Sequence, residues 1–182
     1  MVEHHVANVV VVGSKPIARS RIIFKMRLSE YIFENQIIVG LKSKKKKEVL
    51  AELLSLLIRL KKISPRSKQK IISALLARER LGSTALGQGI AIPHTRLEII
   101  KKPLIVVGIS KQGIDFDSLD GEPVFVIFLI LSPKNLEGVH LKILAGISKI
   151  LRDKYFLNRL KEASKPKQVK ELIKAQEKSL GR

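Results

Sequence analysis

The stretch "GQGIAIPHTR" at residues 87–96 places a histidine directly after an apolar run and a proline. A neutral imidazole is a good nucleophile near pH 7, because one ring nitrogen can attack while a hydrogen bond holds the other. Pro93 has a fixed φ and biases Ile92 toward extended geometry, so a stiff backbone aims His94 at the exit of an expected strand. The residues leave two interpretations open: a reactive histidine, or a structural one that closes the end of the strand.

Two further side chains could act on the same group as His94. His140 is expected on the apolar face of a helix, in the first turn, where free N–H groups favour an anion; the alternative is an ordinary core histidine. Arg78 is expected in the last turn of an earlier helix, where it either grips a phosphoryl group or complements the helix dipole. Ser83 and Thr84 either donate hydrogen bonds to an anion in a phosphate pocket or only shape the turn.

Composition and spacing exclude several other chemistries. The chain has no cysteine, which rules out thiolate metal sites, cysteine nucleophiles and disulfides. His94 and His140 have no third ligand at zinc-site spacing, and the stretch 82–89 lacks the Gly-Lys-Ser/Thr ending of a phosphate-binding loop. We therefore expect neither a metal nor a cofactor.

The chain is strongly basic, with 35 Lys plus Arg against 16 Asp plus Glu and a net charge of +19. Such a balance invites a nucleic-acid or anionic-membrane partner. However, the charge is spread along the chain and aromatic side chains are few, which disfavours a nucleic-acid partner. The apolar runs, such as "VFVIFLIL" at 124–131, are too short to form a transmembrane segment, and no secretory signal is evident, so we expect a cytoplasmic protein.

The hydrophobic periodicity alternates between helical and extended patterns. A helical pattern predicts helices over 45–62, 64–82, from near Val139, over 153–163 and over 166–176. Short, β-branched, largely apolar runs predict buried strands at 89–93, 104–110 and 124–131. Ser64 and Ser164 are expected to cap helices, and Gly82 to end one. Helices, buried strands and helices in this order predict an α/β domain with a sheet covered on both faces.

The chain divides into one domain and two appendages. Residues 1–25 differ in sequence pattern from the rest of the chain, and we expect them to form an N-terminal extension. This extension is either a disordered arm or an added strand over 7–12. The domain is expected to span 26–176, and residues 177–182 to form a basic tail.

Three blocks of the chain together resemble a known family. These are "LLARERLGSTALGQGIAIPHTR" (75–96), "GIDFDSLDGEPVFVIFLILSP" (113–133) and "HLKILAGISKIL" (140–151). They resemble the fructose/mannitol-type (type 2) enzyme IIA domain of the bacterial phosphoenolpyruvate phosphotransferase system, and most of all its stand-alone nitrogen-regulatory branch. The resemblance covers residues 26–173 and implies a three-layer α/β/α sandwich around a mixed β-sheet.

The resemblance also implies roles for the candidate residues. His94 would accept a phosphoryl group on Nε2 from the phosphocarrier HPr or its nitrogen-branch counterpart. His140 matches the second active-site histidine of the family, and Arg78 matches an arginine near the same pocket. Ser83 and Thr84 fall in the same segment as pocket formers.

The downstream partner is left open between two kinds of protein. A sugar-specific IIA passes the phosphoryl group to a separate IIB subunit, whereas a nitrogen-regulatory IIA changes the target proteins that it binds. The absence of cysteine means that no cysteine-type IIB lies in this sequence, which favours the regulator. A binding module that is never phosphorylated is a further alternative. The net charge of +19 departs from the neutral or acidic charge that the resemblance implies, and basic residues around the pocket would impair docking of a basic carrier protein. We therefore expect the lysines to lie mainly away from His94.

Overall fold

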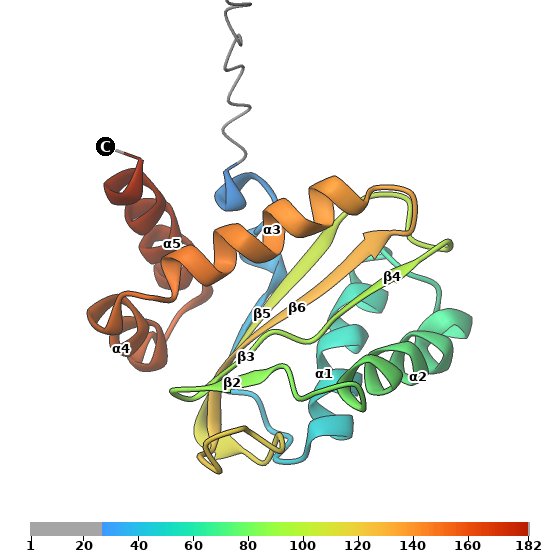
Figure 1. Ribbon diagram of the computed structural model, residues 1–182, viewed down its shortest axis with the longest axis horizontal. Helices are drawn as coiled ribbons and strands as arrows, with labels where there is room; N and C mark the ends of the chain where they lie inside the picture. The colour runs from blue at the N-terminus through green and yellow to red at the C-terminus, as the bar shows by residue number, and fades with distance from the viewer. Residues whose placement is uncertain (1–26, 182) are drawn as a thin grey trace, which may run out of the picture.

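The computed structural model describes residues 27–181, which form a mixed sheet between two layers of helices (Figure 1). The six strands lie in the order β1-β5-β6-β3-β2, with β4 also paired to β6. β5 and β6 are antiparallel, and so are β2 and β3, whereas β1 runs parallel to β5, and β3 and β4 run parallel to β6. The strands are β1 (Ile37–Val39), β2 (Ala85–Gly87), β3 (Ile90–Ala91), β4 (His94–Leu97), β5 (Leu104–Ile114) and β6 (Val124–Pro133).

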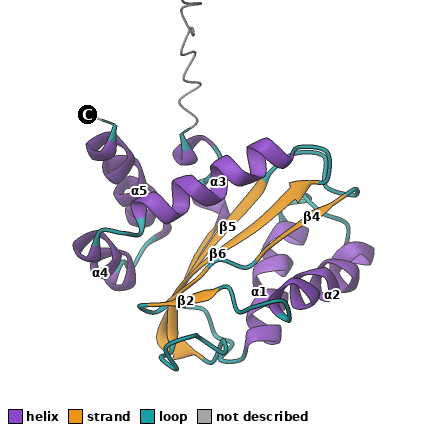
Figure 2. Cartoon of the chain, viewed as in Figure 1, coloured by secondary structure: helices purple, strands orange, loops and turns teal. Residues whose placement is uncertain are grey.

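The helices divide between the two faces of the sheet (Figure 2). α1 (Lys46–Arg59) and α2 (Lys68–Glu79) contribute to one hydrophobic core. α3 (Glu137–Ile150), α4 (Lys154–Glu162) and α5 (Pro166–Leu180) contribute to the other. Three short 3₁₀ turns, η1 (Leu28–Glu30), η2 (Glu34–Gln36) and η3 (Pro65–Ser67), complete the elements of the described chain. The expected three-layer α/β/α arrangement is confirmed.

The long central strands are apolar on both faces because both faces are covered. In β5, Ile105 and Val107 pack into the core under α3 to α5, whereas Leu104 and Val106 pack under α1 and α2. Side chains of successive strand residues point to opposite faces, so this alternation divides one apolar run between two cores. The continuous apolar pattern of the sequence therefore predicted both the strands and their burial.

The segment that carries His94 is not the single strand expected over 89–93. β3 and β4 both pair with β6 in parallel, with Ala91 opposite Ile127 and His94 opposite Ile130. The register is the same on both sides of the break, because His94 follows Ala91 by three residues and Ile130 follows Ile127 by three residues. Proline has no N–H to donate to a ladder, so Pro93 interrupts the strand between its two pieces. His94 thus opens the second piece and does not lie at the end of the sheet.

Several element boundaries also differ from the sequence expectations. α3 begins at Glu137, before the expected start near Val139, and β5 extends to Ile114. The side chain of Ser64 makes no capping hydrogen bond, and helix α2 begins only after the turn η3. The cap of α5 is Lys165, while the backbone N–H of Ser164 donates to the side chain of Gln168. The short strands β1 and β2 were not predicted. The expected extension over 1–25 lies outside the described residues.

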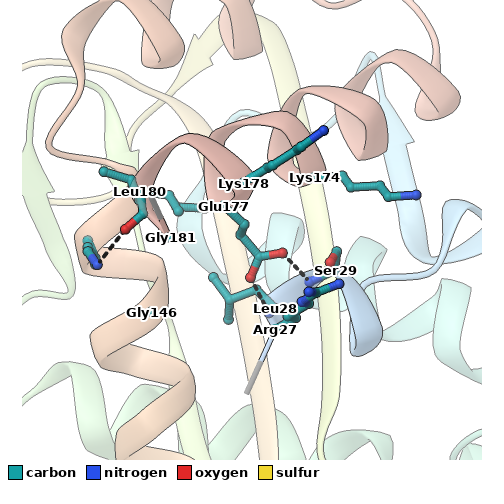
Figure 3. Close-up of a pocket in the computed structure, with 11 residues that line it drawn as sticks. Arg27, Leu28, Ser29, Gly146, Lys174, Glu177, Lys178, Leu180 and Gly181 are labelled. Carbon is teal, nitrogen blue, oxygen red and sulfur yellow. Dashed lines mark hydrogen bonds between the residues drawn. The ribbon is translucent and has the colours of Figure 1, made fainter. Parts of the chain in front are cut away.

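The last helix continues beyond the expected end of the domain at residue 176. α5 runs to Leu180, and Glu177 in its last turns accepts hydrogen bonds from the backbone N–H groups of Leu28 and Ser29 (Figure 3). These N–H groups open η1 and have no partner within that turn. The contact lies in a cavity of about 440 Å³ between η1, α3 and α5. Residues 177–180 therefore continue α5, and Glu177 holds this end of the helix against η1.

We predict that Glu177→Ala lowers the free energy of unfolding by about 1–3 kcal/mol, because it leaves two backbone donors without their charged acceptor. Glu171→Ala is the matched control, since Glu171 is an exposed carboxylate on the same helix; it should change stability by about 0.5 kcal/mol or less. Urea denaturation of both variants measures the effect. Equal stability of the two variants would contradict an anchoring role for Glu177.

Candidate functional site

His94 is half-buried at the start of β4, and its ring is held in one tautomer. Nδ1 lies 2.8 Å from the backbone carbonyl oxygen of Ile92. A carbonyl only accepts, so Nδ1 carries the proton and donates it. Nε2 is left with a lone pair, which accepts a hydrogen bond from Arg78 Nε at 3.2 Å. The geometry therefore selects Nε2 of His94 as the nucleophilic atom.

A chain of contacts fixes the carbonyl that holds His94. The N–H of Ile92 donates to the carbonyl oxygen of Thr84 at 3.1 Å. The hydroxyl and the backbone N–H of Thr84 both donate to the buried carboxylate of Glu79. Lys46 Nζ lies 3.3 Å from the same carboxylate and 2.9 Å from Asp117. The end of α2, the start of α1 and the strand break are thereby tied together around the histidine.

Arg78 lies in the last turn of α2, as the sequence predicted. Besides the contact of Nε with His94, its Nη1 donates to the carbonyl oxygen of Gly82 at 3.1 Å. The second bond satisfies a carbonyl just past the helix end and fixes the direction of the guanidinium. One planar cation is thus held beside the nucleophilic nitrogen, in a suitable place to meet an anion.

His140 reaches the same place from the opposite helical layer. Its ring centroid lies 5.4 Å from that of His94, with the planes tilted by 50°. The ring is buried, and its Nδ1 lies 2.9 Å from Ser132 Oγ in β6. The structure therefore brings together His94, His140 and Arg78 from three separate elements, β4, α3 and α2.

Burial is the main reason why the pKa of each histidine is lowered. For His94, desolvation dominates, the carbonyl of Ile92 opposes it, and the charge of Arg78 adds to the lowering of the pKa. For His140, desolvation and the neighbouring His94 and Arg96 lower the pKa from 6.5 to about 4. Both imidazoles are thus neutral at pH 7, which keeps Nε2 of His94 free of a proton.

Ser83 and Thr84 differ in what they offer to an anion. The hydroxyl of Thr84 is buried and donates to Glu79, so it builds the loop rather than facing the space beside His94. Ser83 is half-buried, and its Oγ accepts from the N–H of Ala85 at 3.2 Å. This leaves Ser83 as the hydroxyl of the pair that is closer to solvent.

Sequence reasoning missed four side chains that support the site. Glu79 and Lys46 hold the loop before β2, Ser132 holds His140, and Arg96 forms an ion pair of 2.9 Å with Glu137. Glu79 carried a signal, because a carboxylate on the apolar face of α2 must have buried partners. The signal for Ser132 was a polar residue at the end of the apolar run of β6.

No lysine is among the groups whose charge shifts the pKa values of the two histidines. Apart from His94 itself, which acts on His140, these groups are Arg78, Arg96, Glu79 and Glu137. Over residues 27–181, no three His, Asp or Glu side chains gather as a metal site would require. Within the same range, no helix combines the length and apolar character needed to cross a membrane.

Comparison with known proteins shows the family to which the chain belongs. Residues 30–176 match the family described as "Phosphoenolpyruvate-dependent sugar phosphotransferase system, EIIA 2". The chain belongs to the EIIA 2 family. A nitrogen regulatory protein of Bradyrhizobium diazoefficiens is 35% identical over 136 residues, which cover 75% of this chain and 87% of that protein.

Two solved structures share the fold of this chain, and one relative is much longer than it. The crystal structure of the nitrogen regulatory protein IIA-Ntr from Neisseria meningitidis superposes with a TM-score of 0.73 at 32% identity, covering 80% of this chain and 98% of that one. The mannitol IIA of Escherichia coli, at 24% identity and a TM-score of 0.65, shows the fold alone. The fructose-specific EIIABC component of Bacillus subtilis is 32% identical over 84% of this chain, which spans only 24% of that protein.

We predict that NMR titration gives His94 a pKa below 6.5 and His140 a pKa of about 4. Arg78→Gln should raise the pKa of His94, because it removes a positive charge that opposes protonation of the ring. Arg80→Gln is the control, since the exposed Arg80 carries the same charge at the end of the same helix. An unchanged titration midpoint in Arg78→Gln would contradict the electrostatic role of Arg78.

Proposed function

We propose that the protein is a phosphohistidine carrier of the phosphotransferase system, which accepts a phosphoryl group on Nε2 of His94 from an HPr-like protein. The observation that carries this proposal is the fixed tautomer of His94. Its Nδ1 donates to Ile92, and the bare Nε2 lies against Arg78 and beside His140. A neutral nucleophile between a fixed cation and a second imidazole suits acceptance of an anionic group.

The phosphoryl transfer requires no proton to move between the donor histidine of the carrier protein and His94. The N–P bond to the donor histidine breaks while a new N–P bond forms at Nε2 of His94. The donor ring keeps its own N–H and leaves as a neutral imidazole. His94 keeps the proton on Nδ1, and the hydrogen bond to Ile92 strengthens as the phosphorylated ring gains positive character. Positioning and electrostatic stabilisation carry the reaction.

Arg78 and His140 act on the phosphoryl oxygens in this proposal. Arg78 gives its Nε–H to the lone pair of His94 in the free protein, and the attack uses the same lone pair. The guanidinium must therefore turn its N–H groups to the incoming oxygens as the N–P bond forms. His140 lies on the other side and donates through a ring nitrogen. Ser83 adds a hydroxyl donor at the more exposed edge of this pocket.

We infer a regulatory role from the relatives of nitrogen-regulatory type, which are matched over most of their own length. In this role the phosphorylation state of His94 selects the target protein that binds. The alternative, a sugar-specific IIA that passes the group to a separate IIB, is the weaker proposal, although fructose-specific relatives also match this chain. We place the protein in the cytoplasm, together with its phosphocarrier partner.

We predict that phosphoenolpyruvate, enzyme I and HPr, or the nitrogen-branch counterparts, add one acid-labile phosphoryl group to the wild-type chain. The His94→Ala variant should accept no phosphoryl group, because it lacks the acceptor nitrogen. Its fold should be kept, because β4 pairs with β6 through backbone hydrogen bonds. Intact mass before and after acid treatment measures the product. Phosphohistidine in His94→Ala, or none in the wild type with either carrier, would contradict the proposal.

We predict that His140→Ala still accepts a phosphoryl group on His94, but about 10²-fold more slowly, as expected when one preorganised donor is lost. Onward transfer to an acceptor should be slowed for the same reason. Lys142→Ala, an exposed change on the same helix, is the control and should keep the wild-type rate. Rapid-quench measurements at saturating carrier distinguish this loss from weaker docking. A wild-type rate in His140→Ala would place His140 outside the reaction.

A further inference from the structure

Ser132 is a buried hydroxyl that contacts the second histidine and nothing else that the proposed reaction uses. It lies near the end of β6, fully buried, opposite Arg96 of β4 in the ladder. Its Oγ lies 2.9 Å from Nδ1 of His140. Over residues 27–181, this is the one hydrogen bond of the Ser132 side chain, and no buried side-chain N or O atom is left without a partner.

The direction of this hydrogen bond decides which nitrogen of His140 carries the proton. If Nδ1–H donated to Ser132, the hydroxyl proton of the serine would be buried without an acceptor, at a cost comparable to a lost hydrogen bond. If the hydroxyl donates to Nδ1, its proton is satisfied. A neutral imidazole has one N–H, so the proton of His140 then lies on Nε2.

The tautomer of His140 determines whether it attracts or repels a phosphoryl group. With the proton on Nε2, the ring donates to an anionic oxygen held beside His94. With the proton on Nδ1, the lone pair of Nε2 would face that oxygen and repel it. Because burial and neighbouring charges lower the pKa and keep the ring neutral, a second proton cannot relieve this repulsion at pH 7. The hydroxyl of Ser132 therefore determines whether Nε2 of His140 attracts or repels the phosphoryl oxygen.

We propose that Ser132 is a positioning residue for phosphoryl transfer: its hydroxyl donates to Nδ1 of His140 and fixes the Nε2–H tautomer that binds a phosphoryl oxygen on His94. This inference rests on the proposed carrier function. β6 is paired on both sides, with β5 and with β4, so the hydroxyl is presented from a rigid position. Besides His94, the charged groups that act on His140 are Arg96 and Glu137, which form an ion pair with each other.

The test combines ¹⁵N NMR of the imidazole rings with the rate of phosphoryl acceptance in the full chain. Wild type should show the proton of His140 on Nε2. Ser132→Ala should show a mixture of the two tautomers and accept about fivefold to tenfold more slowly at saturating carrier, with an unchanged KM. Ser132→Thr restores a hydroxyl and should restore both. Ser110→Ala is the matched control, because Ser110 is a buried serine of the neighbouring strand β5.

A double-mutant cycle separates positioning from general loss of structure. If Ser132 acts through His140, then Ser132→Ala should add no further slowing in the His140→Ala background. A proton on Nδ1 of His140 in the wild type would overturn the inference. Wild-type tautomer and rate in Ser132→Ala, or equal slowing in both backgrounds, would overturn it as well.

Failure of the carrier function gives a different result from failure of the inference. A wild-type chain that is never phosphorylated on His94 refutes the carrier function, and with it the role of Ser132 in transfer. A wild-type chain that is phosphorylated, while Ser132→Ala matches it in tautomer and rate, refutes the role of Ser132 alone. The tautomer is read in the unphosphorylated protein, so it does not depend on the choice of carrier.

Discussion

The hydrogen bond from Nδ1 of His94 to the carbonyl of Ile92 is the interaction on which the site depends. It exists because Pro93 breaks the strand and lets the histidine ring turn back on the residue two positions earlier. The carbonyl is itself held through Thr84 and Glu79, so the end of α2 and the strand break form one unit. A local interruption of the ladder thus sets which nitrogen can react, while the register with β6 stays intact.

His94 and His140 must stay neutral although the chain has a net charge of +19 and the accepted group is anionic. A nucleophilic imidazole must be neutral, yet the group that it accepts is anionic and favours cations nearby. Burial lowers the pKa of both rings, and Arg78 supplies the positive charge without competing for the proton, because a guanidinium always stays charged. No lysine is among the groups that shift the pKa of His94.

The sequence indicated the three side chains that meet at the candidate site better than it indicated the contacts that hold them. His94, His140 and Arg78 were each visible from a proline-stiffened run or a helical period, and the central strands from their continuous apolar pattern. The break at Pro93 was not visible, because "GIAIP" has the composition of one strand, and β1 and β2 are too short to show a period. The pairing of the Thr84 hydroxyl with Glu79 was not visible in the sequence, because only the fold creates this contact.

A carrier must hold its phosphoryl group well enough to accept it and loosely enough to pass it on. Groups that stabilise the phosphorylated state as strongly as the transition state would trap the protein in one form. A neutral His140 donates one hydrogen bond without adding a full charge, whereas a protonated ring would hold the dianionic group more tightly. The low pKa of His140 and the serine that sets its tautomer therefore serve the same end. They make the second histidine a donor of limited strength, which suits transfer in both directions.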